Sequence, residues 1–137
     1  MVTFSFENIV AWQKAHAFVL LVYSITRQFP EDEKFGLTSQ FRRAAVSIEA
    51  NIAEGYKKLS KADKLRFLNI SQGSLEECRD YIILSRDLSY ITPEQFLQLY
   101  NSLETTSKLL TGYSKGIINN NGPKQDEKAP EKICQNS

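Results

Sequence analysis

Residues 36–55 read GLTSQFRRAAVSIEANIAEG, and this stretch predicts the fold of the chain better than any other. Apolar residues recur in it at intervals of three and four, the spacing of one face of an α-helix: Leu37, Phe41, Ala44, Ala45, Ile48 and Ile52. A glycine stands at each end of the stretch, at positions 36 and 55. The sequence therefore predicts one amphipathic helix between these glycines.

A row of polar residues runs beside the apolar face of this helix, and its members are Gln40, Arg43, Ser47, Asn51 and Glu54. Alanines lie among them, and small residues let another backbone approach closely. An ordered polar row next to small residues suggests a specific, hydrogen-bonded contact. We therefore interpret the polar row as an oligomer interface, in which Arg43 pairs with Glu54 or Glu49 of a neighbouring subunit rather than with a phosphate.

Two further helices are predicted on either side of this one. The first runs from Glu7 to about Gln28, where the following Phe29-Pro30 ends it because a residue before proline avoids the helical region. The second begins at Ser60, which can cap free N–H groups, and runs to about Leu88. Gly73 lies in its middle, where a glycine costs about 1 kcal/mol relative to alanine, so we expect a close helix approach there.

The last predicted helix has the clearest start signal in the chain. Thr92 is its cap, Pro93 takes the first helical position and Gln95 completes a capping box. From residue 119 the composition changes to NNNGPKQDEKAPEKICQNS, which we interpret as a disordered tail covering residues 119–137. Residues 1–118 are then one domain. Short connections between the helices favour an all-α, antiparallel up-down-up-down four-helix bundle.

Composition limits the class of protein. The 137 residues are 42% hydrophobic and 24% charged, with a net charge of +1, which is typical of one soluble globular domain without a strong overall signal for nucleic acid. The two cysteines, Cys78 and Cys134, lie far apart and suggest a reducing compartment. The N-terminal residues lack the pattern of a signal peptide, and no apolar run reaches membrane-spanning length. We therefore expect a cytoplasmic protein without membrane contact.

Residues that carry chemistry are few and scattered. The single histidine, His16, has Val19 and Leu20 where a metal site on a helix would need a second ligand. Cys78 falls on an apolar helix face, as a core residue does. The glycines do not follow a phosphate-loop spacing. We predict a protein that is not an enzyme, with no catalytic residues, metal site or cofactor.

Three segments carry a resemblance to a known family: AWQKAH at 11–16, FPEDEKFGLTSQFRRAAVSIEANIAEG at 29–55 and RFLNISQGSLEE at 66–77. They resemble the four-helix-bundle family of proteins encoded in intervening sequences of bacterial large-subunit rRNA genes, over about residues 6–115. Glu49 and Ala50 depart from the proline and serine usual in the family, so we expect a straighter helix there. The resemblance implies a small bundle that assembles as a ring-shaped homo-oligomer, with a pentamer favoured, and no defined biochemical role. The bundle is also distantly similar to the accessory protein of diversity-generating retroelements, which works with a reverse transcriptase and RNA.

Local charge gives the best functional signal. Residues 57–66, KKLSKADKLR, carry five cations against Asp63, and the cations are Lys57, Lys58, Lys61, Lys64 and Arg66. In a ring they would repeat as a basic collar that binds phosphates without reading sequence. Arg42 points away from the polar row, so we add it as the freer candidate for a ligand.

These features lead to one main functional hypothesis and two alternatives. The main hypothesis is a non-enzymatic oligomer that binds RNA, DNA or a nucleoprotein partner through its basic residues. In the first alternative the cluster only makes the loop soluble, and the chain is a structural or protein-binding scaffold. The second alternative is an enzyme with a site between subunits.

Overall fold

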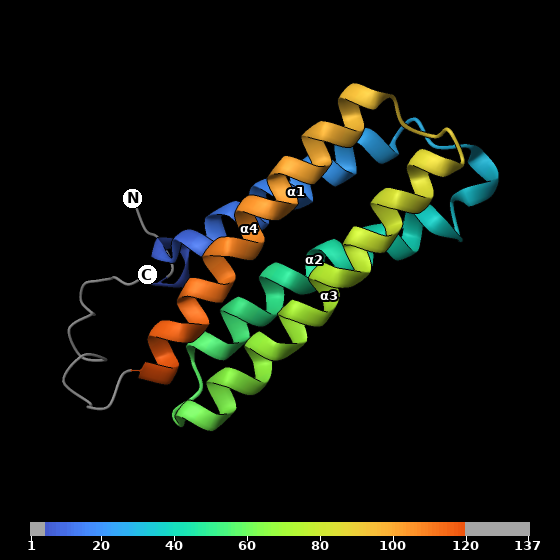
Figure 1. The fold of residues 1–137 in the computed structure, drawn as a ribbon. Helices are drawn as coiled ribbons and strands as arrows, with labels where there is room; N and C mark the ends of the chain where they lie inside the picture. Colours follow the sequence, from blue (N-terminus) through green and yellow to red (C-terminus); the bar gives the residue numbers. More distant parts are fainter. Residues whose placement is uncertain (1–4, 120–137) are drawn as a thin grey trace.

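The computed structural model describes residues 5–119, which fold into helices and short connections (Figure 1). Two short 3-10 helices, η1 and η2, precede the first two of four long α-helices. The bounds are η1 Ser5–Asn8, α1 Val10–Thr26, η2 Glu31–Glu33, α2 Leu37–Tyr56, α3 Lys61–Asp87 and α4 Pro93–Asn119. Residues 5–119 contain no strand, so the predicted all-α fold class is confirmed.

The four long helices form an elongated bundle (Figure 1). Each packs against two others, because α2 contacts α1 and α3 while α4 contacts the same two helices from the other side. The pairing of α2 with α3 is the most extensive. The start of α1, the end of α2, the start of α3 and the end of α4 lie at one end of the bundle. This end is the part of the fold that carries the cations of residues 57–66.

The core lies between the four helices, and α2 contributes the face predicted for it. All six residues of the apolar stripe on α2 are buried. Phe18 and Val22 of α1, Leu75 of α3, and Leu99 and Leu103 of α4 are also fully buried. The predicted stripe of the helix containing residues 36–55 is therefore confirmed, and it leaves the other side of α2 for polar residues.

Two of the predicted helix starts are confirmed by their hydrogen bonds. Ser60 Oγ accepts from the Asp63 N–H at 3.1 Å and caps α3. Thr92 and Gln95 bond each other reciprocally, with the Gln95 N–H to Thr92 Oγ1 at 3.1 Å and the Thr92 N–H to Gln95 Oε1 at 2.9 Å. This is the capping box expected from the sequence.

The first helix begins later than predicted. Ile9 is extended, with φ −79° and ψ 118°, so α1 begins at Val10 and residues 5–8 form a separate 3-10 turn. Gln13 Nε2 donates to the Glu7 carbonyl at 2.7 Å and so closes the turn onto the helix. Further along, α2 continues without a break through Glu49.

The expectation for Gly73 is wrong, and a different glycine marks the close approach. A Cβ added at Gly73 would meet nothing within 4 Å, because this position is exposed on α3. At Gly55, by contrast, a Cβ would lie 3.2 Å from Phe67 Cβ and 3.3 Å from the Lys64 carbonyl oxygen. The tight contact between α2 and α3 therefore lies beside their connection.

The predicted boundary between bundle and tail falls close to the last described helical residue. Asn119, which we assigned to the tail, is the last residue of α4. The predictions for residues 120–137, including disorder and the position of Cys134, lie outside the described residues.

Candidate nucleic-acid and oligomer interfaces

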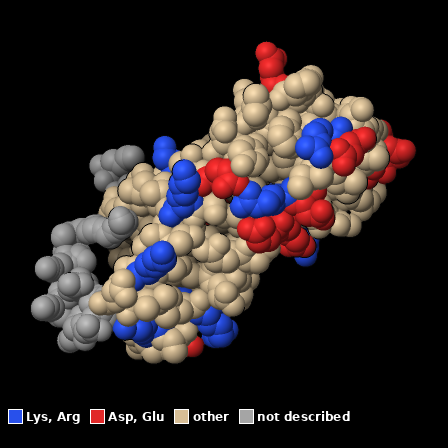
Figure 2. All heavy atoms as spheres, viewed as in Figure 1, with Lys and Arg blue, Asp and Glu red and all other residues tan. Residues whose placement is uncertain are grey.

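The cations of residues 57–66 lie where α2 ends and α3 begins, and we call them the basic rim. Its members are Lys57, Lys58, Lys61, Lys64 and Arg66. One acidic residue, Asp63, lies in the same segment, which leaves a net charge of +4. Figure 2 shows that Lys and Arg predominate at this end of the face in view, whereas Asp and Glu gather toward its middle and the opposite end. The end of the bundle that holds the basic rim is thus electropositive.

Two lysines of the basic rim bond the ends of helices. Lys61 Nζ donates to the Ile118 carbonyl at 3.1 Å, and Lys64 Nζ donates to the Tyr56 carbonyl at 2.8 Å. Carbonyls in the last turn of a helix lack partners within the helix, and a cation there also suits the helix dipole. Lys61 therefore holds the end of α4 beside the start of α3. Lys64 provides a hydrogen-bond donor for a carbonyl in the last turn of α2.

Two other cations of the basic rim share one aromatic ring. Lys58 Nζ lies 4.9 Å and Arg66 Cζ lies 4.7 Å from the centroid of the Phe67 ring. Each also has an acidic partner three or four positions earlier in the sequence, with Lys58 Nζ 3.6 Å from Glu54 and Arg66 Nη2 3.5 Å from Asp63. Exposed pairs of this kind are worth about 0–1 kcal/mol, so an incoming anion can compete with them.

The connection between α2 and α3 carries the most exposed apolar side chain of the described residues. Leu59 is 99% exposed. Lys57, two positions earlier, is exposed, and its side chain forms no hydrogen bond or ion pair with residues 5–119. Our sequence analysis overlooked Leu59 and Phe67 as site residues because it examined charge alone. The signal was present, since Leu59 belongs to no helical stripe and interrupts the cluster of cations, while Phe67 directly follows its last member, Arg66.

Arg42 is not the free cation that we expected. Its Nε donates to Thr26 Oγ1 at 2.8 Å and its Nη2 donates to the Tyr23 carbonyl at 3.3 Å. The guanidinium also lies 4.5 Å from the centroid of the Tyr23 ring. Arg42 therefore binds the last turn of α1 to α2, at the end of the bundle opposite the basic rim.

Part of the predicted polar row faces α3 of the same chain. Ser47 Oγ accepts hydrogen bonds from Ser74 Oγ at 2.8 Å and from Asn51 Nδ2 at 3.1 Å. Gln40 Oε1 accepts from the Tyr81 hydroxyl at 3.2 Å. These residues already join α2 to α3 within one subunit.

The rest of the row is exposed. Arg43 forms no ion pair within residues 5–119, and Glu54 has only the long contact with Lys58. Glu49, the other acid considered for Arg43, instead accepts from His16 Nδ1 at 2.8 Å. The role of the row between subunits therefore stays a prediction, and Arg43 and Glu54 are exposed members of the row.

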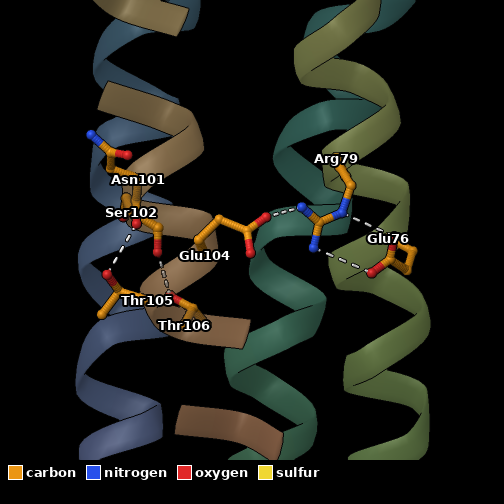
Figure 3. A network of polar contacts seen from close by, with 7 residues as sticks. All are labelled: Glu76, Arg79, Asn101, Ser102, Glu104, Thr105 and Thr106. Atoms are coloured by element: carbon orange, nitrogen blue, oxygen red, sulfur yellow. Dashed lines mark hydrogen bonds and ion pairs between the residues drawn. The ribbon is translucent and has the colours of Figure 1, made fainter. Parts of the chain in front are cut away.

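A polar network that the sequence did not indicate joins α3 to α4 (Figure 3). Arg79 bonds Glu104 of α4 and also Glu76 of its own helix, with 3.0 Å between Arg79 Nε and Glu76 Oε1. The bonds to Glu104 and then Glu76 raise the pKa of Arg79 above its ordinary value. Nearby, the buried Thr106 hydroxyl donates to the Ser102 carbonyl at 2.9 Å. The network fixes the two helices to each other.

The chemically reactive side chains occupy structural positions. His16 stacks on Trp12 with 4.8 Å between ring centroids and bonds Glu49, so it links α1 to α2. Cys78 is fully buried, and burial raises the pKa of its thiol far above its ordinary value. Within residues 5–119 no three His, Cys, Asp or Glu side chains gather as a metal site. No helix of that range is both long and apolar enough to cross a membrane.

Comparisons with known proteins agree with this architecture. The family model of the 23S rRNA-intervening sequence protein matches residues 7–112. A crystal structure of a Bacteroides thetaiotaomicron protein, described as a protein of unknown function from the S23 ribosomal protein family, is 30% identical and superimposes with a TM-score of 0.70. The match covers 77% of this chain and 96% of the Bacteroides chain. Among curated proteins no match is found. The chain therefore belongs to the family of 23S rRNA-intervening sequence proteins.

Proposed function

We propose that this protein is a non-enzymatic, cytoplasmic oligomer that binds the phosphate backbone of RNA or DNA through its basic rim. The observation that carries the proposal is the pair of cations on Phe67. Lys58 and Arg66 are held around one ring although like charges repel, and only exposed, weak acidic partners offset them. A phosphate near this ring would meet two charge-assisted donors at once.

The proposal includes an antiparallel bundle that assembles into a ring, with a pentamer favoured. The connections between Tyr56 and Lys61 and between Asp87 and Pro93 contain only four and five residues, and such short connections support the antiparallel order. The exposed side of the polar row, with Arg43, supports a repeated contact between copies. In such a ring the basic rim would be repeated once per subunit, and several weak sites on one particle bind a long polyanion with avidity.

The test is a salt titration of binding with two variants of equal charge change. The rim variant is Lys57→Gln/Lys58→Gln/Arg66→Gln, which spares the lysines that bond helix ends. The control variant is Arg27→Gln/Lys34→Gln/Arg86→Gln, at the opposite end of the bundle. We expect the unaltered chain and the control to lose affinity steeply between about 50 and 200 mM salt. The rim variant should bind weakly, with a slope of log K against log salt that is smaller by about 2–3 for duplex DNA.

Two outcomes would contradict the proposal. If neither RNA nor DNA binds at low salt, the rim is not a nucleic-acid site. If the rim and control variants weaken binding equally, only net charge matters and the rim has no special role.

One observation favours a second function, a protein-binding scaffold without nucleic acid. Half of the six cations that we selected donate hydrogen bonds to the last turn of a helix, and these are Lys61, Lys64 and Arg42. They therefore stabilise the fold of the subunit. A scaffold predicts that the rim variant keeps its protein partners and that nucleic acid does not compete with them.

A further inference from the structure

Leu59 protrudes from the basic rim, and no side chain of residues 5–119 buries it. It is 99% exposed in the connection between Tyr56 and Lys61, where a polar residue would fit equally well. The buried leucines of the bundle, such as Leu68 and Leu75, stabilise the fold by leaving water, whereas Leu59 contributes nothing of this kind. Its apolar surface is available to a partner.

The surroundings of Leu59 specify the charge of that partner. Lys57 and Lys58 precede it, and Lys61 follows two positions later. The Nζ of Lys61 is held on the Ile118 carbonyl, and the Ile118 side chain is itself 53% exposed. The connection therefore presents a small apolar surface within a group of cations, which suits a ligand with both negative charge and exposed apolar faces.

Single-stranded nucleic acid has this combination, and a regular duplex does not. In a duplex the faces of the bases are stacked on one another, so a protein meets phosphates, sugars and base edges. In a single strand, phosphates and unstacked base faces are accessible together, and proteins bind them with a basic groove and apolar or aromatic contacts. We infer that the connection between α2 and α3 binds unpaired nucleotides, with Leu59 packed on a base and with Lys57, Lys58 and Arg66 on the flanking phosphates. This inference rests on the proposed function and deepens it.

An anionic lipid surface is the other ligand that an exposed leucine among lysines could bind. One leucine offers much less apolar surface than an acyl chain, and a single myristoyl chain already gives only marginal membrane binding. The ring of Phe67 is also occupied by Lys58 and Arg66 rather than free to insert into lipid. The observations therefore favour a single strand over a membrane.

The experiment measures binding of the full chain to labelled oligothymidylate and to the duplex of that strand with oligoadenylate, at one low salt concentration. We expect tighter binding to the single strand. Leu59→Ser should weaken single-strand binding about fivefold and change duplex binding less than twofold, because the cations remain. Leu97→Ser is the matched control, since Leu97 is 56% exposed on α4 at the other end of the bundle, and it should change neither affinity.

A second variant, Leu59→Trp, gives a direct readout. A larger flat side chain stacks better on a base, so this variant should bind oligothymidylate at least as tightly as the unaltered chain, with a change of the new tryptophan's fluorescence on binding. Trp12, the single native tryptophan, is half-buried in α1, so the same titration of the unaltered chain measures its share of the signal.

Each failure has its own signature. Equal binding of strand and duplex with no effect of Leu59→Ser would overturn the inference and leave the proposed function standing. No binding of either nucleic acid would remove the proposed function and the inference with it. A lower particle mass for Leu59→Ser in light scattering would show that Leu59 contacts another copy, and Leu59-dependent binding to phosphatidylserine vesicles without strand binding would identify a lipid surface. Either result overturns the inference.

Discussion

The Ser74 hydroxyl of α3 donates a 2.8 Å hydrogen bond to Ser47 Oγ of α2. One turn earlier on α3, the buried Ser71 hydroxyl donates to the Ile48 carbonyl at 2.9 Å. Small hydroxyl side chains thus join the two most closely packed helices. Ser47, selected from the sequence as an interface residue, is therefore a contact within the subunit as well.

Replacing Ser47 tests this contact. Ser47→Ala removes the acceptor of the buried Ser74 hydroxyl and should lower the free energy of unfolding by about 1 kcal/mol. Ser47→Leu should lower it by about 1–3 kcal/mol, because a larger side chain must enter a packed seam. Urea denaturation measures both, with the exposed Ser24→Ala on α1 as control. Unchanged stability of Ser47→Leu together with a lower particle mass would show that Ser47 acts between subunits alone.

Two glycines should respond in opposite ways to alanine. Gly73→Ala should raise the free energy of unfolding by about 1 kcal/mol, because a Cβ there meets open space and alanine favours the helix. Gly55→Ala should lower it, because the new Cβ would press on the backbone carbonyl of Lys64 at 3.3 Å. Thermal unfolding of both variants is the measurement. A destabilised Gly73→Ala would indicate that another subunit covers this face of α3.

Arg42 should matter for stability and not for nucleic-acid binding. Arg42→Gln removes the bonds to Thr26 and to the Tyr23 carbonyl, and we expect a loss of about 1–2 kcal/mol in the free energy of unfolding. Lys14→Gln has the same charge change at an exposed position of α1 and should leave stability unaltered. If Arg42→Gln weakens oligonucleotide binding while stability is unchanged, our structural assignment of Arg42 is wrong.

The carboxylate of Glu33 gives the fold a pH dependence. It accepts bonds from the Leu37 N–H at 2.9 Å and the Tyr90 hydroxyl at 2.8 Å, and these bonds hold its pKa below the ordinary value. The ionised form is thus favoured by folding. Its contribution is present above the ordinary pKa of glutamate and is lost as the pH falls through the lowered pKa.

Glu33→Gln should therefore destabilise the protein at neutral pH and have little effect in acid. Urea denaturation at both pH values measures this difference, with Glu31→Gln as the exposed control in the same turn. The bond to Glu33 also raises the pKa of Tyr90, so Tyr90→Phe should cost stability at neutral pH and lose that effect above the raised pKa. A Glu33→Gln effect that is equal at both pH values would contradict this account.

The sequence predicted those features of the fold that depend on residues close together in the chain. The capping box at Thr92, the cap at Ser60 and the apolar stripe of α2 depend on residues within one or two turns, and all three are confirmed. The partners of Arg42 and of Arg79 were not readable, because Tyr23, Thr26 and Glu104 lie on other helices. The basic rim was found because its charges are consecutive in the chain. Lys61 and Lys64 could not be recognised as helix-end donors before the ends of α2 and α4 were known.

The bond from Lys61 to the Ile118 carbonyl has a practical consequence for assay design. It holds the last turn of α4 beside the basic rim, and the first turn of α1 lies at the same end of the bundle (Figure 1). A chain attached to a sensor surface close to residue 5 or residue 119 would therefore turn its basic rim toward that surface and its opposite end toward the solution. Attachment through a cysteine introduced at Ser89, in the connection between α3 and α4 of a chain whose Cys134 is replaced by serine, would orient the molecule the other way and leave the basic rim accessible.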